Sequence, residues 1–121
     1  MTQNEKDLLL KDISARLPYG VKISVDNNIE KVDAVDVLDN VVGYGSWLCS
    51  DVEEVKPYLF PMSSMTEEQK EEHKDLLDNQ YSFDANDNIF TLQDFYCKHH
   101  IDYRGLIPID LAIDSTGLNI Y

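Results

Sequence analysis

The densest group of side chains that could ligate a metal lies in the last quarter of the chain. It consists of Cys97, His99 and His100, and either Cys49 or His73 would have to approach them to complete four ligands. Zinc sites usually draw paired ligands at short spacing from two places in a sequence. Only one such cluster is present, so the sequence predicts no metal site. The three residues are instead expected to belong to a helix and its C-terminal end, where histidines interact well with the helix dipole.

An enzyme or small-molecule site is the alternative use of this region. Asp102 follows the two histidines and could orient His99 or His100 as a base, close to a turn that contains Arg104. The arrangement lacks a nucleophile with a recognisable signature, since no serine of the chain stands in a glycine-flanked elbow. We therefore predict no catalytic residue, and the alternative pocket would consist of His99, His100, Asp102 and Arg104.

Two further motifs fall short of a ligand site. The segment Asp84–Asn88 matches the first side-chain positions of a calcium loop, but Ile89 replaces the required glycine and Phe95 stands where the bidentate glutamate belongs. Gly43 and Gly45 form an isolated pair without the third glycine or the lysine of a phosphate-binding loop. We expect the protein to use no cofactor.

Negative charge is the strongest global feature of the chain. It contains 23 acidic and 10 basic residues, which gives a net charge of −13. Residues 1–20 are neutral, whereas residues 21–56 carry −5 and residues 57–90 carry −6. Contacts to phosphates are normally made by lysine and arginine, so we expect no direct binding to nucleic acid or to an anionic membrane. A protein with a basic surface is the partner that this charge favours.

Size and composition indicate a single domain, 1–121. A chain of 121 residues is close to the commonest domain size, and 43 % hydrophobic residues are typical of a globular protein. No run approaches the roughly 18 apolar residues of a membrane span, and the first residues do not resemble an export signal. The sequence therefore predicts a cytoplasmic protein in which Cys49 and Cys97 are free thiols.

The beginning of the chain predicts an amphipathic helix over residues 3–16. Apolar residues recur there at helical spacing, and Thr2 with Glu5 forms a capping-box pattern at its start. The charged residues of this helix, with Asp12 and Arg16 among them, are expected on its solvent face.

Three short strands are expected to follow, at residues 21–25, 30–38 and 46–49. Alternation of apolar and polar residues supports the first two, and a change of phase at Ala34–Val35 predicts a β-bulge in the second. The glycine-containing stretch before the third strand is expected to be flexible, and a helical turn capped by Ser50 should follow it. The predicted fold is α+β, with the N-terminal helix on a three-stranded antiparallel meander or SH3-like partial barrel.

The second half of the chain predicts two C-terminal helices and a possible edge strand. Residues 56–65 contain two prolines, which argues against a regular helix or a central strand. A capping box predicts a helix over about residues 67–79, and Thr91 is expected to cap the other helix. Alternation over residues 107–113 suggests a final strand, and a proline within it favours a sheet edge.

Two groups of residues are candidates for binding a protein. The acidic candidates share one helix with few apolar positions: Glu67, Glu68, Glu71 and Glu72. Such a ridge is either a solvated helix face or a docking surface for a basic partner. Trp47 and Tyr58 are the aromatic candidates, although aromatic side chains of a small domain also fill its core.

Three segments of the chain resemble a known group of proteins. They are the run from Lys56 to Gln69, the segment from Leu17 to Val21 and the segment from His100 to Ile107. Together they resemble an uncharacterised family of small phage and mobile-element proteins from anaerobic gut bacteria. The resemblance implies an accessory protein made inside a bacterial host cell. It implies no activity and no functional residue.

Two hypotheses for the function follow. The first is a non-enzymatic acidic accessory protein of phage or mobile-element origin that binds a host or phage protein with a basic surface. A sharper form is a mimic of DNA charge, which needs carboxylates spaced like phosphates along one surface. The second is a small enzyme or small-molecule binder that uses the region of His99, His100 and Asp102. It predicts that these side chains converge on a concave pocket.

Overall fold

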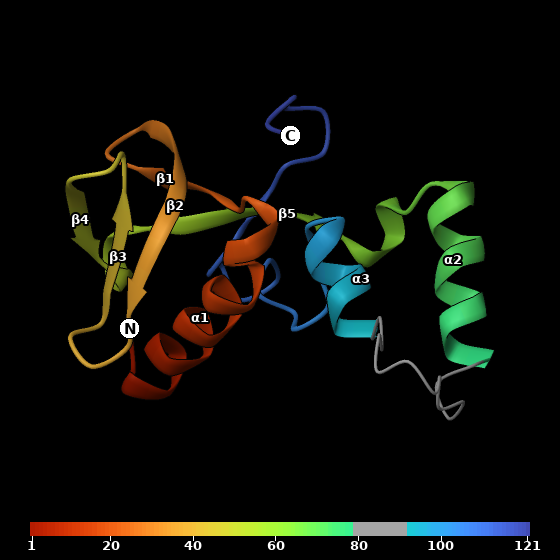
Figure 1. The fold of residues 1–121 in the computed structure, drawn as a ribbon, viewed down its shortest axis with the longest axis horizontal. Helices are drawn as coiled ribbons and strands as arrows, with labels where there is room; N and C mark the ends of the chain where they lie inside the picture. The colour runs from red at the N-terminus through yellow and green to blue at the C-terminus, as the bar shows by residue number, and fades with distance from the viewer. Residues whose placement is uncertain (79–91) are drawn as a thin grey trace.

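The computed structural model of the protein describes residues 1–78 and 92–121. Its fold is α+β, with an N-terminal helix against a sheet of several strands and two later helices to one side (Figure 1). The predicted fold class and the predicted N-terminal helix are confirmed. The calcium-like segment Asp84–Asn88 and the predicted cap Thr91 lie outside the described residues. None of the described helices is both long and apolar enough to cross a membrane.

Helix α1, Gln3–Arg16, begins where its local signals predict. The Thr2 hydroxyl accepts a hydrogen bond from the Glu5 backbone at 3.1 Å, and the Glu5 carboxylate accepts one from the Thr2 backbone at 3.1 Å. This reciprocal pair satisfies two of the free N–H groups at the helix start. A 3₁₀ turn, Leu17–Tyr19, follows the helix and ends at Gly20, whose φ of +74° suits glycine.

Seven strands form one mixed sheet among the described residues. Their bounds are β1 Lys22–Val25, β2 Asn28–Asp36, β3 Val41–Tyr44, β4 Leu48–Asp51, β5 Lys56–Pro61, β6 Ile101–Asp102 and β7 Ile113–Asp114. The order is β4-β3-β2-β1-β5-β6, and β7 also pairs with β5. Strands β1 to β5 pair antiparallel, whereas β6 and β7 run parallel to β5. The antiparallel and parallel parts of the sheet therefore meet at β5.

The first two strands of the predicted antiparallel meander pair as a hairpin. The turn between them contains Asp26 and Asn27, whose φ angles of +49° and +64° are left-handed values that Asp and Asn tolerate better than most residues. Strand β2 changes register against β3 between Val32 and Ala34. The predicted β-bulge is thus confirmed close to its expected position.

The antiparallel meander contains four strands rather than the three predicted. Gly43 and Tyr44, predicted to belong to a flexible stretch, are part of β3. The strand predicted over residues 46–49 begins only at Leu48, and Trp47 lies in the turn before it. Gly45 and Ser46 reverse the chain before Trp47, because both have left-handed backbones with φ of +59° and +71°. The Ser46 N–H donates a hydrogen bond of 2.7 Å to the Asp33 carboxylate, which fixes this turn.

Strand β4 leads into β5 through the 3₁₀ turn η2, Val52–Glu54. The cap of this turn is Asp51, whose carboxylate accepts a hydrogen bond from the Glu53 backbone at 3.0 Å. The prediction that Ser50 caps a helical turn here is wrong. The Ser50 hydroxyl instead lies 2.7 Å from the Tyr44 hydroxyl, on the neighbouring strand.

Strand β5 contradicts the prediction that residues 56–65 hold no central strand. It lies between β1 on one side and β6 and β7 on the other. Pro57 pairs with Ile23 of β1 on one side of β5. On the other side, the pairing with β7 begins only at Tyr58, so β7 needs no N–H donor from Pro57. Pro61 is the last residue of the strand, where proline is also tolerated.

The main core lies between α1 and the antiparallel strands. Helix α1 contributes the buried residues Leu9, Leu10 and Ile13. The sheet and its flanks contribute mainly Val21, Ile23, Val25, Val32, Val42, Val52, Val55 and Leu59. Burying each aliphatic side chain stabilises the fold by about 1.5–3 kcal/mol before the entropy of ordering is subtracted. This core holds the meander and α1 as one body.

Helical segments follow β5. The 3₁₀ turn η3, Met62–Ser64, leads to α2, Glu67–Asp78, whose start has the predicted capping box between Thr66 and Gln69. Helix α3, Leu92–Lys98, lies between α2 and the sheet (Figure 1). The predicted helices are confirmed within the described residues.

The prediction of a strand over residues 107–113 is wrong. Residues 107–112 form turns, and only Ile113–Asp114 pairs with β5 as β7. The carboxylate of Asp102 accepts hydrogen bonds from the backbone N–H groups of Leu106 and Ile107, each at 2.9 Å. These bonds fold the chain back and prevent an extended conformation.

Candidate protein-binding surfaces

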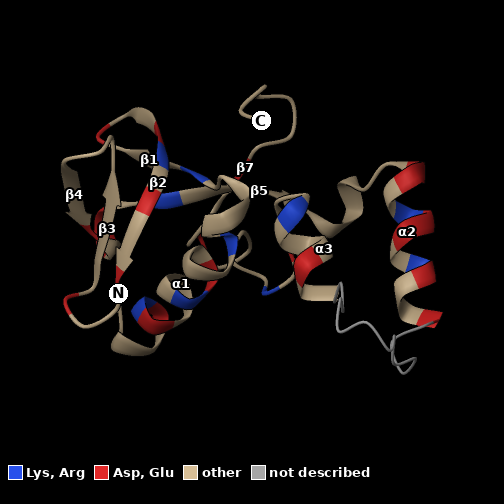
Figure 2. Ribbon diagram, in the orientation of Figure 1, with Lys and Arg blue, Asp and Glu red and all other residues tan. Residues whose placement is uncertain are grey.

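Helix α2 forms an acidic surface at the end of the molecule opposite β4 (Figure 1). Its 12 residues include six carboxylates and two lysines, and none of its side chains is buried. Figure 2 shows acidic residues along its whole length. Glu67 and Glu68 lie in the first turn, where the helix dipole favours negative charge. The predicted ridge therefore lies on an exposed helix.

The inner side of α2 contacts α3 through polar and aromatic side chains. Nε2 of His73 lies 2.8 Å from the Tyr96 hydroxyl, and the ring centroids of His73 and Phe95 are 5.6 Å apart. Nε2 of Gln69 lies 3.3 Å from Nδ1 of His99. These contacts orient α2 although none of its residues is buried.

Glu72 does not belong to the outer face of the predicted ridge. Its Oε2 lies 3.4 Å from Nε2 of His99, and the two form an ion pair when the ring is protonated. Glu67, Glu68 and Glu71 are exposed. These three residues form the more exposed part of the ridge, whereas Glu72, whose side chain is 40 % exposed, also contacts α3.

Trp47 is the most exposed large apolar side chain of residues 1–78 and 92–121, at 94 %. It lies in the turn between β3 and β4, next to Leu48, which is 58 % exposed. A Cβ atom placed on Gly45 would lie 3.6 Å from Leu48 and 3.9 Å from the Glu30 carboxylate, so acidic and apolar side chains flank the same turn. Tryptophan is enriched among the residues that dominate binding energy. Trp47 is therefore a candidate anchor.

Tyr58 is buried, so the prediction that it is an exposed anchor is wrong. Only 9 % of its surface is accessible. Pro57, the residue before Tyr58 in β5, pairs with Ile23 of β1, and Tyr58 itself pairs with Ile113 of β7. Strands on both sides therefore place this tyrosine in the interior of the sheet.

The two histidines of the alternative pocket have different neighbours. His99 contacts Gln69 of α2, whereas the His100 ring stacks on Tyr121 with the ring centroids 3.6 Å apart. His100 has a φ of +58°, so the backbone turns sharply after His99. The predicted convergence of the two rings is not observed.

A small cavity lies beside His99. Its lining consists of Phe60, Ser64, Thr66, Gln69, His99 and Ile101, and its volume is about 130 Å³. Sites for drug-sized ligands have volumes of roughly 300–1,000 Å³. His100, Asp102 and Arg104 do not line the cavity. It is therefore not the pocket that the sequence predicts.

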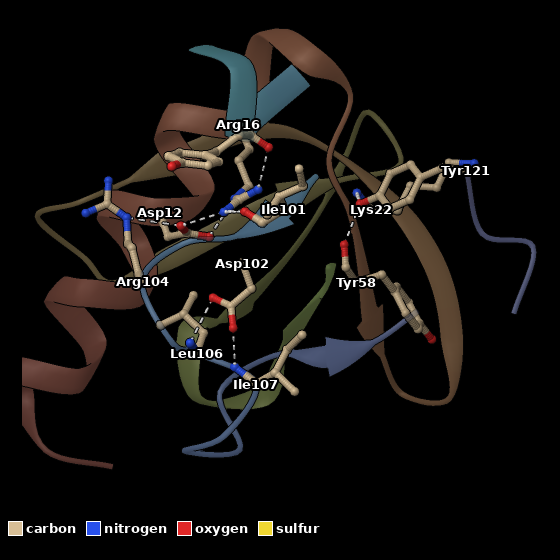
Figure 3. Close-up of polar contacts among 11 residues, drawn as sticks. Asp12, Arg16, Lys22, Tyr58, Ile101, Asp102, Arg104, Leu106, Ile107 and Tyr121 are labelled. Carbon is tan, nitrogen blue, oxygen red and sulfur yellow. Dashed lines mark hydrogen bonds and ion pairs between the residues drawn. The ribbon is translucent and has the colours of Figure 1, made fainter. Parts of the chain in front are cut away.

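Asp12, Arg16 and Arg104 form a buried ion network (Figure 3). Asp12 and Arg16 have no exposed surface. Nε of Arg16 donates to Asp12 at 2.9 Å, and its Nη2 donates to the backbone carbonyl of Ile101 at 2.6 Å. Nε of Arg104 donates to the other oxygen of Asp12 at 3.1 Å. The network joins α1 to the segment after α3, so Arg104 has a structural role.

The prediction that Asp12 and Arg16 lie on the solvent face of α1 is wrong. Their spacing of four residues is the only signal of the pair in the sequence. Ile101 and Arg104 complete the network. Ile101 is 85 positions from Arg16, and Arg104 is 92 positions from Asp12. Local periodicity cannot identify contacts over such separations.

Tyr121 joins β1 and β5 where the two strands separate (Figure 3). Its hydroxyl accepts a hydrogen bond from the Lys22 N–H at 2.9 Å and donates one to the Tyr58 carbonyl at 2.8 Å. The residue keeps 41 % of its surface exposed, yet burial of the hydroxyl raises its pKa to about 12. The hydroxyl thus links two backbone groups that the diverging strands leave apart.

His100 makes the stability of the fold depend on pH. Burial, then the charges of Arg16, His99 and Lys22, lowers its pKa from 6.5 to about 4. When the pH falls below 6.5, the unfolded chain takes up a proton that the folded protein does not accept until the pH nears 4. The free energy of unfolding that His100 contributes above pH 6.5 is therefore lost as the pH falls from 6.5 to about 4.

We expect the thermal midpoint of His100→Asn to fall less steeply between pH 6.5 and pH 4 than that of the wild type. Asparagine does not titrate there, and it tolerates the left-handed backbone of this position. Both proteins have the same carboxylates, so the difference between the two curves reports on His100. Parallel curves would contradict the prediction.

Among the described residues, the cysteines and histidines are not gathered into one group of candidate metal ligands. Cys49 is exposed on β4 and Cys97 is buried in α3, and both are free thiols. Burial raises the pKa of the Cys97 thiol. Within residues 1–78 and 92–121, no group of three or more His, Cys, Asp or Glu side chains is placed to hold a metal ion.

Comparison of the chain with models of protein families, with curated proteins and with solved structures gives no match. Function resides in particular sites rather than in a fold, so it has to be inferred from the exposed residues. Among the residues that the structure describes, the turn at Trp47 and the outer face of α2 are the two exposed candidates that the sequence predicted.

Proposed function

We propose that the protein is a non-enzymatic acidic accessory protein, of phage or mobile-element origin, that binds another protein in the bacterial host cell. The observation that carries the proposal is the 94 % exposure of Trp47, beside the half-exposed Leu48. An indole ring left in water adds nothing to the core, whereas in a complex it supplies large apolar area and a hydrogen-bond donor. Anchors of this type dominate the energy of protein interfaces.

The charge of the protein favours a partner with a basic surface. The net charge is −13, and Glu30 and Asp33 lie beside the turn that contains Trp47. Complementary charge accelerates association and makes it sensitive to salt. Helix α2 offers a second acidic surface at the other end of the molecule, and the DNA-mimic form of the proposal would use that helix.

The arrangement of strands supports the SH3-like partial barrel predicted from the sequence. The order β4-β3-β2-β1-β5 and the 3₁₀ turn between β4 and β5 agree with that description, and β6 and β7 extend it. Folds of this kind carry many unrelated functions. The proposal therefore depends on Trp47 and its surroundings, not on the fold.

Trp47→Ala is expected to weaken partner binding by about 2 kcal/mol or more, a roughly 30-fold loss of affinity. The measurement is a tagged pull-down from a lysate of the cells that produce the protein, washed at low and high salt and followed by titration of the recovered partner. Leu38→Ala is the matched control, because Leu38 is 93 % exposed in a different turn, between β2 and β3. Equal binding by the two variants would overturn the role of Trp47.

A charge-reversal pair separates the two acidic surfaces in the same assay. Glu68→Lys with Glu71→Lys changes the outer face of α2 and leaves the contact between Glu72 and His99 intact. Asp7→Lys with Asp39→Lys changes the net charge equally at exposed positions away from α2. Loss of binding only in the α2 pair, with Trp47→Ala unaffected, would favour docking through α2 and the DNA-mimic form.

A further inference from the structure

Strand β4 is at the edge of the sheet, and its pairing with β3 shows which of its backbone groups face outward. The two strands pair as Val42 with Ser50 and Tyr44 with Leu48, among others. At the end of the ladder, the Val52 N–H donates to the Asn40 carbonyl at 2.8 Å. In an antiparallel ladder, pairs that exchange hydrogen bonds alternate with pairs that do not. Counted from the bonded pair of Asn40 and Val52, the pairs of Val42 with Ser50 and of Tyr44 with Leu48 are also hydrogen-bonded. Ser50 and Leu48 therefore direct their N–H and carbonyl groups toward β3.

By the same alternation, Cys49 and Asp51 direct their backbone groups away from β3. No other described strand pairs with β4, and residues 48–51 have no further backbone partner among the described residues. Unpaired groups along an edge strand are a template for pairing with another chain. Natural edges are commonly blocked by proline or lysine, and β4 contains neither.

The side chains around this edge indicate what kind of segment would pair with it. Residues 45–55 contain three carboxylates and neither lysine nor arginine. Glu53 pairs with Lys6 at 3.1 Å, which leaves Asp51 and Glu54 as the acidic side chains open to a partner. Trp47 precedes the strand and supplies an apolar contact at its other end.

We propose that β4 accepts an extended segment rich in lysine or arginine from the partner protein as an additional strand of the sheet. This inference rests on the proposed function and specifies how the partner binds. Backbone hydrogen bonds to Cys49 and Asp51 hold the segment, an apolar residue of the segment packs on Trp47, and its cations lie near Asp51 and Glu54. A second copy of the chain is a poor occupant, because each copy has a net charge of −13.

Proline at position 51 tests the backbone hydrogen bonds directly. Asp51 has a φ of −59°, which proline adopts without strain, and its N–H faces away from β3. Asp51→Pro therefore removes the outward donor. Asp51→Ala is the matched control, because it loses the same carboxylate and the same cap of η2 but keeps the N–H.

The probe is a displayed library of random twelve-residue peptides selected against the full chain. We expect enriched peptides to alternate basic with apolar or β-branched residues. Asp51→Pro should weaken their binding by about tenfold or more relative to Asp51→Ala, the value of one lost hydrogen bond of about 1.4 kcal/mol. Absence of enriched peptides, or equal affinity for the two variants, would overturn strand addition. Circular dichroism of both variants checks their fold.

Amide hydrogen exchange of the unmodified protein gives a second readout that needs no proline. The selected peptide should slow the exchange of the Cys49 and Asp51 amides, and unchanged rates at both positions would overturn the inference. The two proposals can fail separately. A lysate partner that depends on Trp47 but binds Asp51→Pro and Asp51→Ala equally would leave the proposed function intact and exclude strand addition.

Discussion

Replacing Asp12 by alanine is expected to lower the free energy of unfolding by about 3–5 kcal/mol, the usual cost of removing one partner of a buried ion pair. Asp12 accepts hydrogen bonds from both Arg16 and Arg104, and neither Asp12 nor Arg16 has exposed surface. Without the carboxylate, the Arg16 guanidinium stays buried with only backbone carbonyls as acceptors. Its lost hydration is then uncompensated, and the contact between α1 and the segment after α3 weakens.

Urea unfolding followed by circular dichroism measures this loss. Asp7→Ala is the matched control, because Asp7 is exposed on the same helix, and its effect should stay within about 0.5 kcal/mol. Arg104→Ala should fall between the two, since Arg104 is partly exposed and its removal leaves Asp12 paired with Arg16. Equal losses for Asp12→Ala and Asp7→Ala would contradict the buried ion network. Should Asp12→Ala fail to fold, Asp12→Asn tests the charge with nearly unchanged shape.

Replacing Phe95 by alanine is expected to cost about 3–5 kcal/mol, as for other fully buried phenylalanines. Its ring has no exposed surface, and the ring centroids of His73 and Tyr96 lie 5.6 Å away and that of His99 lies 4.9 Å away. These neighbours include the contacts that orient α2. The amides of α2 should therefore exchange with solvent faster in this variant, relative to those of α1.

Tyr96→Phe separates the ring from the hydroxyl in this experiment. It keeps the aromatic contact with Phe95 and removes only the hydroxyl that lies 2.8 Å from His73. We expect a loss of about 0.5–1.5 kcal/mol, typical of one hydrogen bond. Unchanged exchange of the α2 amides in Phe95→Ala would show that other contacts hold this helix, and would contradict the prediction.

The parts of the fold that were predictable from the sequence are those with local signals. The capping boxes at Thr2 and Thr66 mark the starts of α1 and α2, and both are present. The bulge near Ala34 follows from a change of phase within one strand. Each of these signals involves residues only a few positions apart, so no knowledge of the tertiary structure is needed to interpret it.

The parts that the sequence did not reveal depend on residues far apart in the chain. Arg16 resembles any exposed helix arginine until Ile101 supplies its carbonyl. Pro57 argues against a central strand unless the point where β7 begins to pair is known. The same limit applies to the candidate sites. Trp47 and Tyr58 have similar aromatic character, and only the turn after β3 and the strands beside β5 show which of them is exposed.

Strand β5 also determines when the protein can complete its fold as it leaves the ribosome. Helix α1 and strands β1 to β5 are finished once Pro61 has been synthesised, and strands β1 to β4 have all of their strand partners within this segment. The parallel partners come much later, since Phe60 pairs with Ile101 and Tyr58 pairs with Ile113. Until then the nascent chain carries one uncovered edge of β5, a state prone to aggregation. The yield of folded protein is therefore expected to depend on the protection that chaperones give to this edge during translation.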